Sequence, residues 1–229
     1  MKVLILGDGL LGSEIKKQTD WDLISRKTHT FDFNQITSVY KFLKDYDVIL
    51  NCIANTDTYS KNKEDHWNVN YKAVSRLTDW CNENHKKFVH ISTDFVYANN
   101  TNAPSEEEVP VHAQNWYSYT KLLADGYIEL KGNDYLLIRT SFKPTPFPYD
   151  TAFTDVISNC DYVNKNASRI IDLINQKHSG IYNVGGNEKS IYELAKETHP
   201  DVKGGLSKGW MPKDVRMNCN KFNNANKKD

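Results

Sequence analysis

The sequence predicts an α/β fold built on a doubly wound parallel sheet. Short apolar runs recur along the first 140 residues, and segments with helical spacing separate them. The first run leads directly into a glycine-rich turn. Short runs of this kind are typical of strands that helices cover on both faces. Their alternation with helices favours a parallel sheet with right-handed crossovers.

Five apolar runs are expected to form strands of this sheet. They are Val3–Leu6, Leu23–Ser25, Val48–Ile53, Phe88–Ser92 and Tyr135–Thr140. Between them, apolar residues fall three or four positions apart, as on one face of a helix. The predicted helical segments are residues 36–43, 67–80 and 119–128.

The pattern changes after Thr140. Ser141–Tyr149 contains three prolines and is expected to form a loop. Residues 166–177 then show helical spacing, and Gly180–Gly185 reads as a further strand. Ser190, followed three residues later by Glu193, is typical of a capping box at the start of a helix.

The composition excludes several classes of protein. The 29 basic and 29 acidic residues give a net charge of zero, so no nucleic acid or anionic membrane partner is expected. Apolar runs stay far below the length of about 18 residues needed for a membrane span, and the N-terminal run is too short for a signal peptide. The four scattered cysteines, without C-x-x-C, predict reduced thiols, no metal site and a cytoplasmic location.

A glycine motif follows the first predicted strand. Gly7, Gly9 and Gly12, with Leu10 and Leu11 between them, form G-x-G-x-x-G. Such a loop holds the pyrophosphate of a dinucleotide at the N-terminus of the next helix. The alternative is a β-hairpin, because Asp-Gly is a strong turn signal. The residues after Gly12 do not alternate in polarity, which favours the dinucleotide loop.

Two basic residues end the second predicted strand. NAD sites usually carry an acid there for the ribose 2′-hydroxyl, whereas a basic residue accommodates the 2′-phosphate of NADP. Arg26 and Lys27 occupy this place and therefore favour NADPH. The alternative is that both side chains are simply solvated.

A tyrosine four residues before a lysine places both side chains on one helix face. A lysine ammonium beside the phenol lowers its pKa from about 10, so the tyrosine can exchange a proton with a carbonyl oxygen. The sequence contains five such pairs, Tyr40/Lys44, Tyr59/Lys63, Tyr117/Lys121, Tyr127/Lys131 and Tyr192/Lys196.

A strand that ends in hydroxyl residues distinguishes one pair from the others. Ser92 and Thr93 end the fourth predicted strand, and ligands of parallel sheets bind at the carboxyl ends of strands. Only Tyr117/Lys121 begins a helix shortly afterwards. We therefore expect Thr93, Tyr117 and Lys121 to form the catalytic set.

Together these motifs resemble the extended short-chain dehydrogenase/reductases, and among them the dTDP-4-dehydrorhamnose reductases. The glycine loop is one residue shorter than the usual loop of that family, and the chain is shorter than typical members after Thr140. The matching segments are Gly7–Gly12, Asn51–Thr56 with Val69-Asn70, Ser92–Tyr97, Tyr117–Lys121, Ile138–Ser141 and Gly180–Val184.

The resemblance implies a role for each candidate residue. Tyr117 would donate the proton, Lys121 would lower its pKa and hold the nicotinamide ribose, and Thr93 would bond the reacting oxygen. For Thr93 and Asn70 the alternative is a structural hydrogen bond. The remaining residues implied in cofactor binding are Asp32 near the adenine, Ala54, Asn55, Thr56 and Asn70.

The implied activity is NADPH-dependent reduction of a 4-keto-6-deoxy nucleotide sugar, as in dTDP-rhamnose synthesis. An epimerase or epimerase/reductase would use the same residues, and a non-catalytic NADP-binding regulatory subunit is the alternative from another class. The expected organisation is an NAD(P)-binding Rossmann domain over residues 1–140 and a small discontinuous substrate-binding region over residues 141–229. In that region Lys213 or Arg216 would meet the diphosphate, or remain solvated. A homodimer is compatible with this reading.

Overall fold

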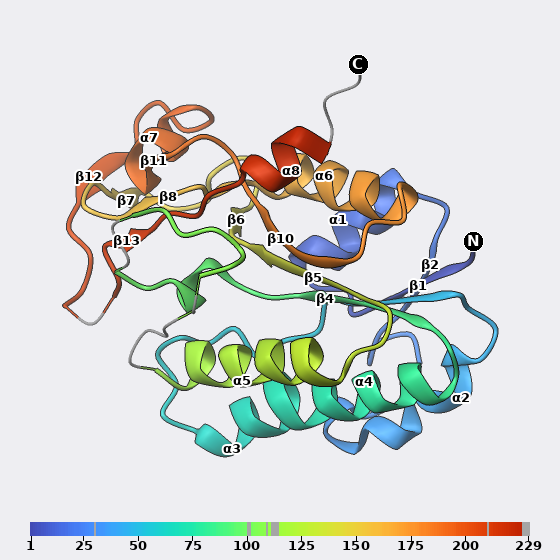
Figure 1. Cartoon of the computed structure of the whole chain (residues 1–229). Coiled ribbons are helices and arrows are strands. Elements are labelled where there is room, and N and C mark those ends of the chain that lie inside the picture. The colour runs from blue at the N-terminus through green and yellow to red at the C-terminus, as the bar shows by residue number, and fades with distance from the viewer. Residues whose placement is uncertain (30, 100–101, 109, 111–114, 210, 226–229) are drawn as a thin grey trace.

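The computed structural model describes residues 1–29, 31–99, 102–108, 110, 115–209 and 211–225. It confirms the predicted α/β fold, with six strands in the order β10-β5-β4-β3-β1-β2 (Figure 1). All neighbouring strands are parallel. The strands are β1 (Val3–Leu6), β2 (Asp22–Ile24), β3 (Val48–Asn51), β4 (Lys87–Ile91), β5 (Tyr135–Thr140) and β10 (Gly180–Val184).

The direction of winding reverses between β1 and β3. The chain passes from β1 outward to β2, then returns to the other side of β1 and continues through β3, β4 and β5. In open parallel sheets, ligands bind at such a switch point, outside the carboxyl ends of the strands. The topology therefore locates the site before any side chain is considered.

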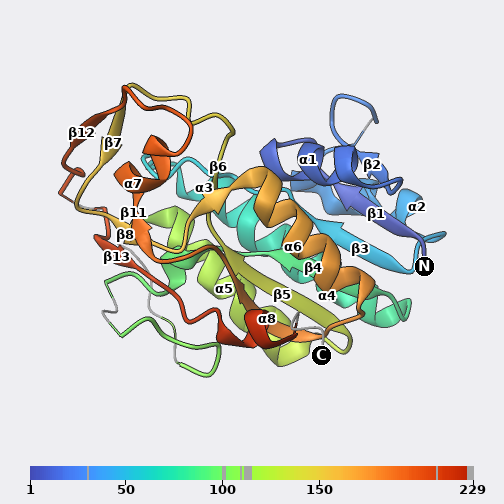
Figure 2. The same ribbon diagram turned by 90° about the horizontal axis from the view of Figure 1, so that it is seen from above.

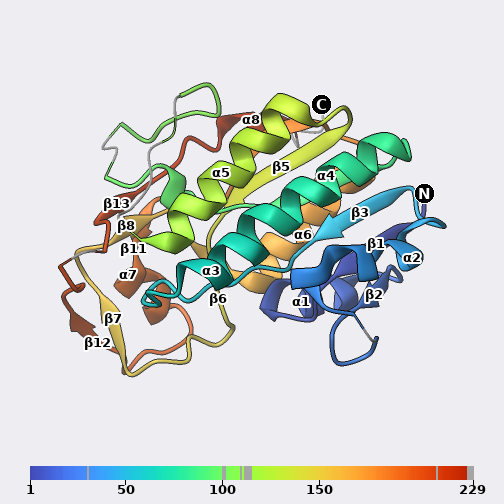
Figure 3. The ribbon, with the colours of Figure 1, turned by 90° about the horizontal axis from the view of Figure 1, so that it is seen from below.

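Helices cover both faces of the sheet (Figures 2 and 3). Alternate strand residues point to opposite faces, so Leu4 and Leu6 pack in one core while Val3 and Ile5 pack in the other. The first core includes α2 (Tyr40–Leu43), α4 (Ala73–Glu83) and α5 (Trp116–Lys131). The second includes α1 (Leu10–Gln18), α6 (Val163–Asn175) and α8 (Asn220–Ala225).

Two predicted helices are less regular than their spacing suggested. The segment predicted over residues 36–43 is a 3-10 helix, Phe33–Ser38, followed by the single turn α2. The segment predicted over residues 67–80 contains a π-helix, Trp67–Lys72, between α3 (Lys63–His66) and α4. The spacing of apolar residues indicates which face of a helix is buried. It cannot distinguish a short 3-10 or π-helical segment from an α-helix, because the repeats are similar.

The chain after residue 140 does not form a separate unit. Strand β10 pairs with β5, and α6 packs on α1, so both belong to the main layers. The assignment of residues 141–229 to substrate binding stays a prediction. Residues 210 and 226–229 of the predicted substrate region lie outside the described residues.

The rest of this region forms small sheets around a third core. Their orders are β11-β8-β13, β12-β7 and β6-β9. The Ser190 hydroxyl accepts a hydrogen bond from the Glu193 N–H, and the Ser190 N–H donates one to the Glu193 carboxylate. The predicted capping box is therefore confirmed. The elements are β6 (Phe142–Lys143), β7 (Thr151–Phe153), β8 (Ile157–Ser158), β9 (Asp161–Tyr162), β11 (Lys189–Ser190), α7 (Ile191–Lys196), β12 (Lys203–Gly205) and β13 (Asp214–Val215).

Among the described residues, no helix has both the length and the apolar character that crossing a membrane requires.

Candidate functional site

The glycine loop joins β1 to α1 at the switch point of the sheet. Gly7 has a φ of +103°, and Gly9 precedes α1 without any side-chain cap. No acidic residue lies in the first turn of this nine-residue helix. The first N–H groups of a helix have no partner within it, and the helix N-terminus carries a partial positive charge. This arrangement suits a pyrophosphate. The hairpin alternative is wrong, because β1 pairs in parallel with β2 and β3.

Gly9 and Gly12 serve different needs. A Cβ on Gly12 would lie 2.0 Å from the carbonyl oxygen of Gly7, so this glycine allows α1 to approach the end of β1. A Cβ on Gly9 would meet no described atom within 4 Å, which leaves open space over the loop. Leu10 is exposed beside that space, whereas Leu11 is buried in the core. The loop therefore fits a dinucleotide at Gly9 and Leu10.

A polar cavity of about 520 Å³ opens at the carboxyl end of β2. Arg26 and Lys27 are both exposed there, and Lys27 forms an ion pair of 3.2 Å with Asp8 of the glycine loop. This ion pair brings the cavity next to the glycine loop. The two basic side chains of the cavity suit an anionic group that lies next to an aromatic ring of a ligand. Its lining residues are Arg26, Lys27, Thr28, His29, Phe31, Asp32, Gln35 and Ser38.

The segment after β3 lies against the glycine loop, where a Cβ on Gly7 would come within 2.7 Å of Cγ1 of Ile53. Ala54 and Asn55 are half-buried and Thr56 is exposed. Asn70, in the π-helix, accepts a bond of 2.8 Å from the Asn55 N–H and donates one of 2.9 Å to the Asn55 carbonyl. Asn70 is fully buried, so this geometry favours its structural alternative: it positions Asn55 from behind.

The structure brings the three predicted catalytic residues together. Thr93 follows β4, and its hydroxyl accepts a bond of 3.2 Å from the Phe95 N–H. Tyr117 lies in the first turn of α5, close enough to the Thr93 hydroxyl for that group to influence the pKa of the phenol. Lys121 follows one turn later on the same helix and is fully buried. A tyrosine, a hydroxyl and a lysine therefore meet at the carboxyl edge of the sheet.

The amine of Lys121 contacts two groups of β4. It lies 2.9 Å from Nε2 of His90 and donates to the carbonyl of Ile91 at 2.5 Å. His90 in turn contacts the amide of Asn51, on β3, at 3.1 Å. Sequence reasoning did not single out either residue for this role. The available signal was a polar side chain inside each of two apolar strands.

Burial is the largest influence on the pKa values of Tyr117 and Lys121. Burial raises the pKa of Tyr117 to about 12; the nearby Thr93 hydroxyl opposes the rise, and the carboxylates of Asp94 and Asp125 add to it. Burial lowers the pKa of Lys121 to about 8. The amine of Lys121 lies against His90 and Ile91, and its effect on the pKa of the phenol stays a prediction.

Asp94 links the site to the C-terminal region. Its carboxylate accepts bonds from the hydroxyls of Thr93, at 3.2 Å, and of Ser158 on β8, at 3.0 Å. Burial raises the pKa of Asp94 to about 6, and the hydroxyl bonds oppose that rise only in part. The contact between the two parts of the chain therefore contains a carboxyl group that titrates near neutral pH.

We expect Asp94→Asn to remove a pH dependence of stability. The folded-state pKa of Asp94 lies above its usual value near 4, so the folded protein binds this proton more tightly than the unfolded chain. The wild type therefore loses stability as pH rises through the window from about 4 to 6. Over this window, the free energy of unfolding of the variant should rise relative to that of the wild type by at most about 3 kcal/mol. Urea unfolding of both proteins between these pH values tests this; a constant difference would contradict it.

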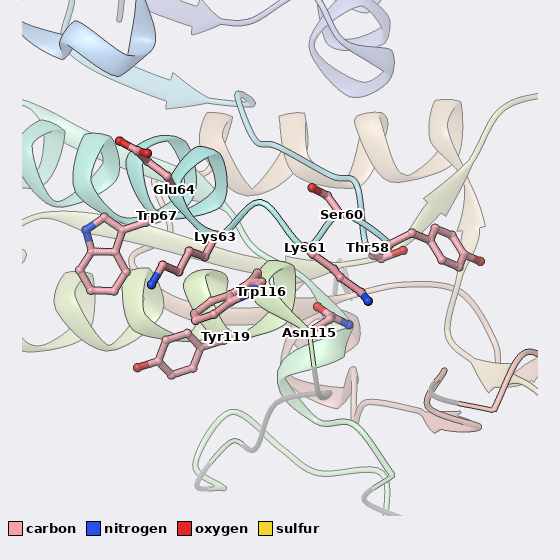
Figure 4. Close-up of a pocket in the computed structure, with 10 residues that line it drawn as sticks. Thr58, Ser60, Lys61, Lys63, Glu64, Trp67, Asn115, Trp116 and Tyr119 are labelled. Carbon is pink, nitrogen blue, oxygen red and sulfur yellow. The ribbon is translucent and has the colours of Figure 1, made fainter.

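A larger cavity of about 1010 Å³ lies between the loop after β3 and the start of α5. Figure 4 shows Trp67 and Lys63 from the α3 side and Trp116 and Tyr119 from the α5 side. The sequence analysis did not single out this aromatic cavity. Its lining residues are Thr58, Tyr59, Ser60, Lys61, Lys63, Glu64, Trp67, Asn115, Trp116 and Tyr119.

The two basic residues expected near a diphosphate already have carboxylate partners. Arg216 pairs with Asp214 at 2.7 Å and with Glu188 at 3.2 Å. Lys213 pairs with Asp155 at 3.3 Å. Their contact with a diphosphate stays a prediction, and it would require an exchange of these partners.

Comparisons with known proteins agree with this geometry. The family model described as "RmlD substrate binding domain" matches residues 1–143. The "Probable low-salt glycan biosynthesis reductase Agl14" of Haloferax volcanii is 30% identical over 141 residues, which are 59% of this chain and 46% of that protein. The aligned part thus spans less than half of that relative.

Solved structures match over nearly the whole chain. The "hypothetical dTDP-4-dehydrorhamnose reductase" from Sulfolobus tokodaii has a TM-score of 0.85 and 25% identity, covering 100% of this chain and 96% of that one. The dTDP-4-dehydrorhamnose reductase from Bacillus anthracis str. Ames, solved in complex with NADP, also has a TM-score of 0.85. Its identity is 21%, over 99% of this chain and 94% of that one.

Proposed function

The chain belongs to the RmlD substrate binding domain family, as its motifs predicted, and from this premise we propose that it is an NADPH-dependent reductase of a 4-keto-6-deoxy nucleotide sugar. The observation that carries the proposal is the placement of the Tyr117 phenol beside Thr93 at the carboxyl edge of the sheet, with Lys121 one turn away on the same helix. This group lies at the same edge of the sheet as the glycine loop. The relatives named as dTDP-4-dehydrorhamnose reductases support the choice of sugar.

The residues present suit the reduction of a carbonyl. NADPH, when bound, supplies the hydride that goes to the carbonyl carbon. The Thr93 hydroxyl would hold the carbonyl oxygen, and Tyr117 would donate its phenolic proton to that oxygen. Lys121 would hold the nicotinamide ribose and, as an ammonium, lower the pKa of the phenol.

Residues at the carboxyl ends of β1, β2 and β3 would bind the cofactor. The pyrophosphate would occupy the space over Gly9, at the N-terminus of α1. Ala54, Asn55 and Thr56 would line the nicotinamide half, and Asp32 would lie near the adenine. The 2′-phosphate would enter the basic cavity beside Arg26, since the end of β2 carries no acid for a free 2′-hydroxyl.

We expect NADPH to bind more tightly than NADH, and Arg26→Ala to abolish most of that preference. A charge-assisted bond to the phosphate contributes about 1.5 to 3 kcal/mol, so the variant should lose about 10- to 100-fold in NADPH affinity. Its affinity for NADH should change little. Titration followed by nicotinamide fluorescence measures both constants.

Arg76→Ala is the control for this titration, since Arg76 is an exposed arginine on α4. It removes the same charge and should leave both affinities unchanged. Equal affinity of the wild type for the two cofactors, or tighter binding of NADH, would contradict the NADPH assignment.

Incubation with NADPH and a 4-keto-6-deoxy nucleotide sugar separates the candidate functions. A reductase consumes one NADPH for each sugar reduced, which absorbance of the nicotinamide follows directly. An epimerase would invert a centre of the sugar without net consumption of NADPH. A regulatory subunit would bind the cofactor and change neither compound. Either of these last two outcomes would refute the proposed function.

A further inference from the structure

A buried chain of hydrogen bonds leads from β3 to Lys121. Asn51 and His90 are directly opposite each other in the paired strands β3 and β4, and neither is exposed. Asn51 contacts Nδ1 of His90 at 3.1 Å, and Nε2 of His90 contacts Nζ of Lys121 at 2.9 Å. Three polar side chains are therefore connected through the two nitrogens of one imidazole.

The direction of the hydrogen bonds in this chain is set at Asn51. The Ile53 N–H donates to Oδ1 of Asn51 at 3.0 Å, and a backbone N–H can act only as a donor. Asn51 must then present its NH₂ group to His90, so Nδ1 accepts. A neutral imidazole that accepts at Nδ1 carries its proton on Nε2. The Nε2–H therefore points at the amine of Lys121.

A lysine ammonium does not fit at the end of this chain. An ammonium has three donors and no lone pair, so it cannot accept from Nε2–H. Moving the imidazole proton to Nδ1 would set it against the NH₂ group of Asn51. Turning the Asn51 amide would set that NH₂ group against the Ile53 N–H. A neutral amine fits, because it accepts from His90 and donates to the Ile91 carbonyl.

The surrounding charges are consistent with this assignment. The charged or titratable groups facing Lys121 are His90, Asp125 and Cys52. Asp125 favours the ammonium, but its carboxylate is bound by the buried Arg139 at 3.1 Å. Burial raises the pKa of the Cys52 thiol to about 12, so it stays neutral. Burial also lowers the pKa of His90 well below its usual value, and a positive charge on Lys121 would lower it further, so the imidazole is neutral in either state of the lysine.

We propose that His90 and Asn51 favour the neutral amine of Lys121 in the arrangement described, and that Lys121 takes up one solvent proton when the dinucleotide binds. The second half rests on the proposed function, in which the amine turns towards the ribose and leaves Nε2–H. The proton adds to the lone pair of Nζ, and no other bond is broken. His90 is thus a positioning residue that keeps the phenol of Tyr117 inactive until the cofactor is present.

The tautomer of His90 tests the first half without any cofactor. In ¹⁵N-histidine-labelled wild type at pH 9, the ring should carry its proton on Nε2 and none on Nδ1. The signal is assigned by triple-resonance experiments and checked by its loss in His90→Gln. A proton on Nδ1 in the wild type would overturn the proposal, and this measurement requires no variant to fold.

Asn51→Asp provides the reversed case. A carboxylate accepts at both oxygens, so it should draw the imidazole proton to Nδ1 and leave Nε2 to accept from a charged lysine. The expected result is the opposite tautomer in this variant. Asn187→Asp adds the same charge at an exposed site and should keep the wild-type tautomer. An unchanged tautomer in Asn51→Asp would contradict the chain of bonds.

Proton uptake tests the second half. Calorimetric titration of NADPH at pH 9, in buffers of different ionisation enthalpy, should show uptake approaching one proton in the wild type and in Asn187→Asp. Asn51→Asp should take up much less, because its Lys121 is already charged. Equal uptake in wild type and Asn51→Asp would overturn this half. Failure to bind NADPH at all would instead refute the proposed function, and the tautomer result would be unaffected.

Discussion

Turnover of the Tyr117→Phe variant is expected to fall at least about 100-fold, since general acid catalysis typically contributes 10²- to 10⁴-fold. The substitution removes a single oxygen, which lies near the Thr93 side chain. The ring keeps its edge-to-face contact with Phe95, so the fold and cofactor affinity should be retained. Steady-state kinetics with NADPH and the nucleotide sugar, beside a cofactor titration, measure the effect.

Tyr127→Phe is the matched control on the same helix. The Tyr127 hydroxyl donates to both carboxylate oxygens of Asp79 on α4, at 2.8 and 2.9 Å, so it joins two helices. Its loss should lower stability slightly and leave turnover nearly unchanged. Near-normal turnover in Tyr117→Phe, or the reverse pattern between the two variants, would place the reaction elsewhere.

Gly12→Ala is expected to abolish NADPH binding and to destabilise the fold by about 3 kcal/mol or more, at the upper end of overpacking effects. The new Cβ would lie 2.0 Å from the Gly7 carbonyl oxygen. Both groups are held by the backbone, so no side-chain rotation relieves the contact. Helix α1 would have to move away from β1, and the phosphate site would move with it. Urea unfolding and NADPH titration measure the two losses.

Gly9→Ala separates the ligand from the fold. A methyl group at Gly9 meets no described atom within 4 Å, and its φ of −66° suits alanine, so stability should change by less than about 0.5 kcal/mol. The methyl would occupy the space proposed for the pyrophosphate, so NADPH affinity should fall at least about tenfold. Wild-type affinity in this variant would show that the phosphates lie elsewhere, and a stable Gly12→Ala would refute the close approach.

The sequence alone was sufficient for features that depend on neighbouring residues or on chain order. The five predicted strands occur within one or two residues of their expected ends, because a buried strand is a continuous apolar run. The capping box at Ser190 needs residues only three positions apart. The expected placement of Tyr117 and Lys121 near the end of β4 follows from chain order, since consecutive parallel strands bring their carboxyl ends to one edge of the sheet, and their catalytic role stays a prediction.

Tertiary structure decided the features that depend on residues far apart in the chain. Strand register sets Asn51 opposite His90, 39 residues later, and this pairing directs the proton at Lys121. Burial sets the pKa of Tyr117 and Lys121, and burial is a property of the packed chain. Strand β10 joins the main sheet although it follows the proline-rich loop, because its pairing with β5 spans 44 residues between Leu136 and Gly180. A local pattern can identify a strand or a polar group, but only the fold determines its partner.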